Sequence, residues 1–111
     1  MSMFHGNKVP EVSAVDAESG QAGHILLDVR NADEWEAGHA PSAQWVPLRE
    51  LESVRFQLPM NKRIVCVCRS GARSAQAMVI LRNAGLDKVA NLAGGMLRWR
   101  AQRFTVEGGS E

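Results

Sequence analysis

Residues 64–74 read Ile-Val-Cys-Val-Cys-Arg-Ser-Gly-Ala-Arg-Ser, and three kinds of local sequence meet in this stretch. Residues 64–67 are uncharged and mostly β-branched, which predicts a buried strand. Residues 68–73 are small or polar, which predicts a loop. Residues 74–84 carry apolar side chains at helical spacing, which predicts a helix. Its inward positions would be Ala75, Met78, Leu81 and Ala84.

Strands and helices alternate through the rest of the chain. The apolar run 24–29 ends in charged residues, and such runs are typical of strands buried on both faces of a parallel sheet. Further strands are predicted at 9–13, 44–47 and 89–92, and helices at 16–21, between Asn31 and Gly38, at 48–57 and at 96–102. This alternation predicts an α/β fold, a parallel-rich sheet covered on both faces. Ligands of such folds lie beyond the carboxyl ends of the strands, where Asp28 and Cys68 are placed.

Composition excludes several classes of protein. The chain has 111 residues, which suits one domain, and its 45% hydrophobic and 23% charged residues exclude general disorder. A net charge of +1 gives no bulk attraction to nucleic acid or an anionic membrane. Residues 1–55 carry 4 basic and 9 acidic groups, and residues 56–111 carry 9 and 3. This asymmetry either balances charge over one surface or attracts a small anion to the C-terminal half.

The sequence also predicts a reduced, cytoplasmic protein. No apolar stretch approaches the roughly 20 residues of a transmembrane helix, and the first residues lack the apolar core of a signal peptide. The only cysteines, Cys66 and Cys68, lie two positions apart in sequence, too constrained for an ordinary disulfide. Two such cysteines also argue against a zinc site, so we expect no metal. Cys66 reads mainly as a small strand residue, with a resolving thiol as the alternative.

The loop at 68–73 is the strongest chemical signal. A tight loop that leads into a helix directs its backbone N–H groups inward as an anion-binding nest. Gly71 permits backbone angles that a Cβ would forbid, and Arg69 and Arg73 add positive charge. A cysteine at the mouth of such a nest has a lowered pKa, and its thiolate is a nucleophile. We therefore predict that Cys68 is reactive, with a plain buried cysteine as the alternative.

Two reactions use a thiolate in a cradle of amides. In one the thiolate attacks phosphorus, and in the other it attacks a sulfane sulfur and forms a persulfide. Cysteine-dependent phosphatases carry Cys-x5-Arg, whereas Cys68 and Arg73 are spaced as Cys-x4-Arg. The shorter loop favours one bound sulfur atom over a tetrahedral phosphate. A phosphatase or arsenate reductase, and a non-catalytic binding module, are the alternatives to a sulfurtransferase.

Three separated motifs resemble single-domain rhodaneses, a family of sulfurtransferases. The loop from Cys68 to Arg73 resembles the six-residue rhodanese loop. Residues 26–30 with 34–43 resemble the N-terminal signature, except that Ala40 replaces the usual Ile and Ser42 the usual Gly. Residues 91–99 resemble the closing Leu-x-Gly-Gly-x-x-x-Trp segment. The resemblance covers residues 9–106, after an N-terminal segment 1–8 and before a tail at 107–111 predicted to be flexible.

The resemblance implies a fold and a reaction. The fold is a five-stranded, mainly parallel sheet with helices on both faces. Cys68 would take a sulfane sulfur from thiosulfate or a protein persulfide donor, and pass it to a thiol acceptor or cyanide without a cofactor. The loop residues implied to hold the substrate are Arg69, Ser70, Gly71, Ala72 and Arg73.

Charged residues outside the loop have two interpretations each. Asp28 and Arg30 form either a structural salt bridge or a support beneath the site, and the resemblance gives them mainly architectural roles. The basic stripe of Arg98, Arg100 and Arg103 is either a solvated helix face or a docking patch for an acidic protein.

Overall fold

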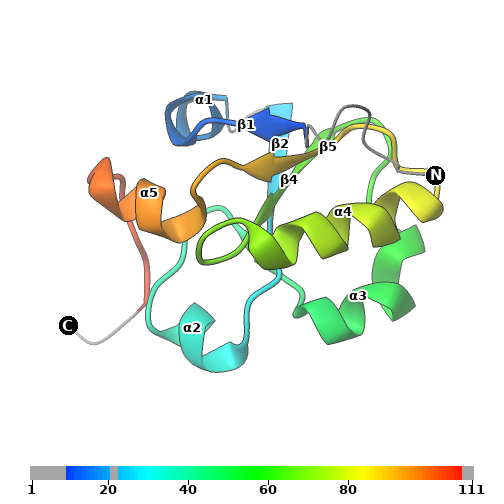
Figure 1. The fold of residues 1–111 in the computed structure, drawn as a ribbon, viewed down its shortest axis with the longest axis horizontal. Coiled ribbons are helices and arrows are strands. Elements are labelled where there is room, and N and C mark those ends of the chain that lie inside the picture. The colour runs from blue at the N-terminus through cyan, green and yellow to red at the C-terminus, as the bar shows by residue number, and fades with distance from the viewer. Residues whose placement is uncertain (1–9, 21–22, 109–111) are drawn as a thin grey trace.

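A five-stranded parallel sheet lies at the centre of the computed structural model, which describes residues 10–20 and 23–108 (Figure 1). Its strands are β1 (Glu11–Val12), β2 (His24–Asp28), β3 (Gln44–Trp45), β4 (Arg63–Val67) and β5 (Val89–Leu92). They lie in the order β1-β5-β4-β2-β3, and each neighbouring pair is parallel. The predicted α/β fold is confirmed, with the most apolar strand, β4, in the middle.

Helices cover both faces of the sheet. They are α1 (Ala14–Ser19), α2 (Ala32–Glu36), α3 (Leu48–Val54, continued by the 3-10 turn Arg55–Gln57), α4 (Ala72–Asn83) and α5 (Gly95–Ala101). Figure 1 shows α1 and α5 together on one side of the sheet, and α3 and α4 together on the other. Crossovers to both faces are the usual way to connect parallel strands.

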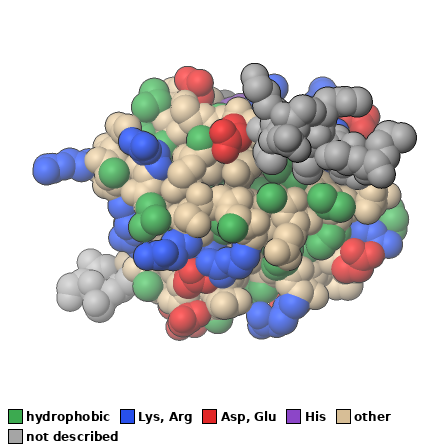
Figure 2. Space-filling model, in the orientation of Figure 1, with side chains coloured by type: hydrophobic (Ala, Val, Ile, Leu, Met, Phe, Trp, Pro, Cys, Tyr) green, Lys and Arg blue, Asp and Glu red, His purple; other side chains and the backbone are tan. Residues whose placement is uncertain are grey.

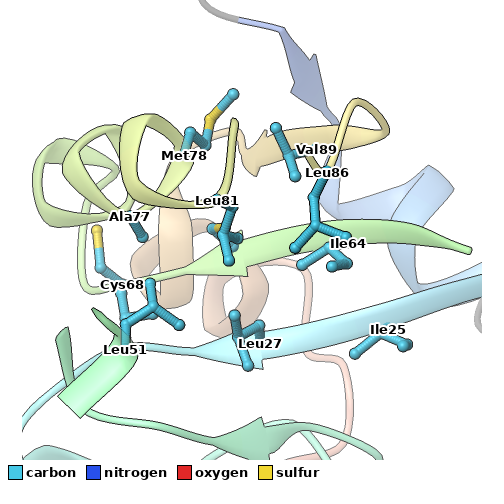
Figure 3. Close-up of a cluster of buried hydrophobic side chains, with 12 residues drawn as sticks. Ile25, Leu27, Leu51, Ile64, Cys68, Ala77, Met78, Leu81, Leu86 and Val89 are labelled. Atoms are coloured by element: carbon cyan, nitrogen blue, oxygen red, sulfur yellow. The ribbon is translucent and has the colours of Figure 1, made fainter. Parts of the chain in front are cut away.

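Two apolar clusters hold these layers together. On the α3/α4 side, Leu51, Met78 and Leu81 pack onto sheet residues that include Leu27 and Ile64 (Figure 3). On the α1/α5 side, buried residues of both helices pack on the opposite face of the sheet. The helices contribute Ala17, Met96 and Trp99, and the strands contribute Leu26 and Val65. Because β2 and β4 are buried on both faces, their sequences show no alternation of polar and apolar residues.

The buried face of α4 differs from its prediction. The helix begins at Ala72, two residues before the predicted start, because Gly71 adopts a left-handed conformation (φ 119°) and ends the loop there. The buried positions are Ser74, Ala77, Met78 and Leu81, whereas Ala75 and Ala84 are only partly buried. Ser74 is buried because it lies under the loop, which no apolar pattern could indicate.

The ends of the chain are described in part. The predicted N-terminal segment 1–8 lies outside the described residues, as do residues 109–111 of the predicted tail. Glu107, placed in that tail, exchanges two backbone hydrogen bonds of 2.8 Å with His39, so ordered pairing extends past the predicted boundary. Among the described residues, none of the helices is long and apolar enough to cross a membrane.

Candidate active site

Cys68 lies at the carboxyl end of the central strand β4. Parallel pairing of Asp28 with Val67 brings the ends of β2 and β4 level, so Cys68 follows at the same edge of the sheet as Asp28. Figure 3 shows its sulfur beneath the loop that joins β4 to α4. The residue is buried, with 1% of its surface exposed. Cys68 thus lies at a strand end and in a loop, where the sequence predicted it, and its role as a nucleophile stays a prediction.

Hydrogen-bond donors surround the sulfur of Cys68. The backbone N–H of Gly71 donates to Sγ at 3.0 Å, and the Ser74 hydroxyl lies 3.4 Å from Sγ. Burial acts to raise the pKa of Cys68, but hydrogen bonds from the Ser74 hydroxyl and from backbone N–H groups of Ser74, Gly71 and Arg73 outweigh it and lower the pKa below the ordinary value. Hydrogen bonds from the described residues thus favour the thiolate form of Cys68.

The N-terminus of α5 fixes the backbone of the loop. Met96 N–H donates to the carbonyl of Cys68 at 2.9 Å, and Leu97 N–H donates to that of Arg69 at 3.1 Å. Gly95 makes this approach feasible, because a Cβ there would lie 2.4 Å from the Cys68 oxygen and 2.5 Å from the Arg69 oxygen. These two carbonyls therefore have hydrogen-bond partners outside the loop, on α5.

Ser74 and Asn91 form a buried polar pair that sequence reasoning did not single out. The Ser74 hydroxyl contacts Asn91 Oδ1 and also lies 3.1 Å from the Gly71 carbonyl. Asn91 Nδ2 lies 3.5 Å from a carboxylate oxygen of Glu11 on β1. Asn91 is only 5% exposed in a strand that is otherwise apolar. A polar side chain in such a strand was the available signal for this network.

Arg73 is paired with a carboxylate. Its guanidinium donates to both oxygens of Glu34, at 2.6 and 2.7 Å, and so joins α4 to α2. These hydrogen bonds lower the pKa of Glu34 to about 2, against the opposing effect of burial, and Glu34 in turn raises the pKa of Arg73. The Arg73 side chain, predicted to bind an anion, thus forms an ion pair with Glu34, while the backbone N–H of Arg73 lowers the pKa of Cys68 by hydrogen bonding. Glu34 lies in the stretch 34–43 of the N-terminal signature, and the sequence did not indicate this partner.

The other predicted loop residues lie on the surface. Arg69, Ser70 and Ala72 are exposed, and Arg69 forms no ion pair with any residue that the structure describes. Their part in binding a substrate stays a prediction.

Asp28 and Arg30 form a buried pair beside the loop. Arg30 Nε and Nη2 donate to the Asp28 carboxylate at 2.7–3.0 Å, and Nη2 also donates to the Gly38 carbonyl at 2.8 Å. The geometry is that of a structural salt bridge, one of the two predicted interpretations. Cys66, by contrast, is fully buried, and desolvation raises its pKa to about 12. Its thiol therefore stays protonated.

The structure describes no group of three or more His, Cys, Asp or Glu side chains that could hold a metal ion in residues 10–20 and 23–108. At this edge of the sheet lies a buried cysteine whose pKa is lowered by N–H groups of its loop, which favours the thiolate form. Such a thiolate can attack an electrophilic sulfur or phosphorus atom and carry it covalently.

Residues 11–102 match the family model for the rhodanese-like domain. The chain belongs to the rhodanese-like domain family. This match spans all five strands and all five α-helices, so the family resemblance read from three motifs is confirmed. In this rhodanese-like domain the matched region includes Cys68, its loop and the α5 segment that holds the loop.

Individual relatives agree with this assignment. Thiosulfate sulfurtransferase 18 of Arabidopsis thaliana is 34% identical over 123 residues, which covers 95% of this chain and 90% of that one. YrkF of Bacillus subtilis, provisionally named a sulfur carrier protein, is 33% identical over 104 residues, which covers 88% of this chain but only 55% of YrkF. A rhodanese-related protein from Thermoplasma volcanium has the same fold, with a TM-score of 0.82 at 26% identity over 88% of this chain and 97% of that one.

Proposed function

We propose that this rhodanese-like domain is a sulfurtransferase that carries sulfane sulfur as a persulfide on Cys68. The observation that carries the proposal is the lowered pKa and the geometry of Cys68, whose sulfur accepts a 3.0 Å hydrogen bond from the Gly71 N–H at a strand end. Family membership and the sulfur-transfer names of relatives support the same chemistry.

The reaction has two balanced steps. The Cys68 thiolate attacks the outer sulfur of thiosulfate, a new S–S bond forms, and the old S–S bond breaks with its electron pair leaving on sulfite. A thiolate acceptor or cyanide then attacks the outer sulfur of the persulfide, and the electron pair of the broken bond returns to Sγ of Cys68. The loop N–H groups stabilise negative charge on sulfur in both steps. A persulfide carried by a protein would serve equally as donor.

The other two functions considered are not favoured. A phosphatase or arsenate reductase fits the Cys-x4-Arg spacing less well, and Arg73 is paired with Glu34 rather than directed at a bound oxyanion. A purely binding module would not need a thiol whose pKa is lowered. The proposal places the protein in the cytoplasm, where cysteines such as Cys66 and Cys68 stay reduced.

Intact-protein mass spectrometry after incubation with thiosulfate tests the proposal. We expect the wild type to gain one sulfur atom, and cyanide to remove it as thiocyanate. Cys68→Ser should gain none. Cys66→Ala is the matched control, since it deletes the other cysteine, whose thiol stays protonated and buried, and it should gain sulfur as the wild type does.

Either of two results would contradict the proposal. Sulfur retained by Cys68→Ser would place the carrier elsewhere. No gain with thiosulfate or with a small organic persulfide, in a protein whose Cys68 alkylates readily, would exclude sulfur transfer at this site. Phosphate or arsenate turnover would then be the next measurement.

A further inference from the structure

Exposed arginines surround the mouth of the Cys68 loop. Arg69 follows Cys68 directly, and Arg98 and Arg100 lie on α5, whose N-terminus binds the loop. Figure 2 shows Lys and Arg side chains gathered around hydrophobic ones where α5 and the loop lie. Leu97, 49% exposed, lies between these arginines in sequence. We call Arg69, Leu97, Arg98 and Arg100 the basic surface.

The charges of the basic surface are not neutralised within the described residues. None of its three arginines forms an ion pair with residues 10–20 or 23–108, whereas Arg30, Arg49, Arg55 and Arg73 all do. Arg100 makes one hydrogen bond of 3.3 Å, to the Ala37 carbonyl. Three like charges without counter-charges attract a ligand of opposite sign.

Two pockets flank Leu97 and reach the loop. One, of about 170 Å³, lies between α2 and α5 and is lined by three arginines and one carboxylate, Glu34. Arg30 is paired with Asp28 and Glu34 with Arg73, so Arg69 and Arg100 are the arginines of this pocket without an ion-pair partner among the described residues. The other, of about 480 Å³, is lined by Ser70, Gly94, Leu97, Arg98 and Ala101. Arg69 and Ser70, the two residues after Cys68, each line one of them. A ligand that enters both pockets therefore crosses Leu97 and contacts the two residues that follow Cys68.

The shape of the basic surface favours a polypeptide over a small anion. A small anion needs one cluster of donors, but here the positive charge is divided between two pockets that share the exposed Leu97, with Arg69 and Arg100 in one and Arg98 in the other. Arginine next to exposed apolar side chains is characteristic of protein interfaces. In a polypeptide with carboxylates beside an apolar residue, the carboxylates would pair with the arginines and the apolar residue would contact Leu97, which lies between the two pockets.

We propose that the basic surface docks an acidic, cysteine-bearing segment of a partner protein, which exchanges sulfur with Cys68. This inference rests on the proposed function and names the class of its macromolecular partner. Carboxylates of the segment pair with Arg98 and Arg100, and its cysteine thiolate attacks the outer sulfur of the Cys68 persulfide. The S–S bond to Sγ breaks, its electron pair returns to Cys68, and the partner leaves as the persulfide.

Synthetic cysteine peptides test this docking. The probes are three peptides of equal length in which the cysteine is flanked by glutamates, by serines or by lysines. Cys68 is first loaded with sulfur and its persulfide is verified by mass spectrometry; its discharge by each peptide is then timed. We expect the glutamate peptide to react about tenfold faster than the serine peptide at low salt, and the advantage to disappear at high salt because charges are screened. The lysine peptide should be slowest.

Charge reversal locates the effect on the protein. The double variant Arg98→Glu/Arg100→Glu should invert the preference between glutamate and lysine peptides. Lys62→Glu/Lys88→Glu makes the same change in net charge and should keep the wild-type preference. Both lysines are exposed and directly precede β4 and β5, at the edge of the sheet opposite to Cys68. Dividing the peptide ratio of each variant by that of the wild type removes differences in the intrinsic reactivity of the peptides.

The outcomes separate this inference from the proposed function. If Cys68 loads sulfur and cyanide discharges it, but the glutamate peptide has no salt-dependent advantage, the docking inference is wrong and the sulfurtransferase stands. If Cys68 never loads sulfur, the proposed function itself fails. If an oligonucleotide blocks discharge and a cysteine-free glutamate peptide does not, the basic surface binds nucleic acid and the inference is overturned. If both charge-reversed variants change the peptide preference equally, the preference comes from the net charge of the protein and not from a docking surface, and the inference is overturned.

Discussion

At the scale of single residues, the Ser74 hydroxyl has one proton and three neighbouring acceptors. These are Sγ of Cys68 at 3.4 Å, the Gly71 carbonyl at 3.1 Å and Oδ1 of Asn91. When Cys68 is ionised, its negative charge makes Sγ the strongest acceptor of the three, since hydrogen bonds to charged groups are about twice as strong as neutral ones. Ser74 therefore supports the thiolate state specifically.

Replacing Ser74 by Ala should raise the pKa of Cys68. Loss of one hydrogen bond to a charged group costs about 1.5 kcal/mol, which corresponds to about one pKa unit. The pH dependence of alkylation by iodoacetamide measures it. The wild-type midpoint should lie below 9, and that of Ser74→Ala should lie about one unit above the wild-type value.

Ser53→Ala is the matched control for this experiment. Ser53 on α3 also donates to a carbonyl three residues earlier, Glu50, at 2.9 Å, but it is exposed and belongs to a different helix. Its alkylation profile should equal that of the wild type. An unchanged midpoint in Ser74→Ala would limit Ser74 to a packing role.

At the scale of secondary-structure elements, α5 acts as a clamp on the β4–α4 loop. Its first N–H groups bind the carbonyls of Cys68 and Arg69, and the close approach depends on Gly95, whose φ is 56°. The backbone geometry of Cys68 thus depends on an element almost thirty residues further along the chain. A substitution that distorts the start of α5 should therefore change the position and reactivity of the Cys68 sulfur.

Gly95→Ala should therefore impair both stability and chemistry. The new Cβ would meet backbone atoms at 2.4–2.6 Å, which cannot move aside as a flexible side chain can. We expect a loss of about 3 kcal/mol in the free energy of unfolding, from backbone strain together with broken hydrogen bonds. Urea unfolding measures this loss, and sulfur loading by thiosulfate should also become slower.

Gly85→Ala is the control that separates the effect of backbone strain from the effect of the steric clash expected in Gly95→Ala. Gly85 also has a positive φ, 92°, but its Cβ would meet nothing within 4 Å. This variant should lose only about 1 kcal/mol and load sulfur normally. Equal losses in the two variants would mean that the contact between α5 and the loop adds nothing.

The order of the elements was predictable because the signals for each are local. The predicted runs 24–29 and 64–67 are apolar enough to specify buried strands, and Gly85 follows α4 as expected. The start of α4 was not predictable to the residue, because Gly71 rather than a polar N-cap begins it. Within the site, Cys68 could be identified from its loop, but the contact of Ser74 with Asn91 joins positions 17 residues apart. Local spacing carries no information about such a contact.

At the scale of the whole molecule, the pair Glu34–Arg73 joins α2 to α4, the helix that follows the Cys68 loop. The partners are 39 positions apart in sequence and are 23% and 32% exposed. Both oxygens of the carboxylate are bound, which makes this pair stronger than a typical surface pair. Its charge state couples the stability of the fold to pH.

Glu34→Gln should destabilise the protein by about 1 kcal/mol at pH 7, given the partial exposure of both side chains. Folding lowers the pKa of Glu34 from 4.5 to about 2, so its ionised form contributes stability above pH 4.5. That contribution is lost as the pH falls from about 4.5 towards 2. Urea unfolding of wild type and variant at several pH values should therefore converge in acid.

Glu50→Gln provides the control, because Glu50 lies 3.8 Å from Arg49 and both side chains are more than half exposed. It should change stability by no more than a few tenths of a kcal/mol at any pH. A difference between Glu34→Gln and wild type that persists unchanged at pH 2.5 would show that the ion pair is not its cause.

The position of β1 at one edge of the sheet has a consequence for biosynthesis. Its sheet contacts are with β5, where Glu11 is paired with Asn91 and Val12 with Leu92. A ribosome makes β1 among the first segments of this sequence and β5 among the last, so β1 must wait without a sheet partner while the intervening residues are translated. Glu11 also reaches the Asn91 side chain. The polar network beneath the thiol is thus completed only when the two ends of the domain meet, and a nascent chain halted before residue 91 cannot assemble it.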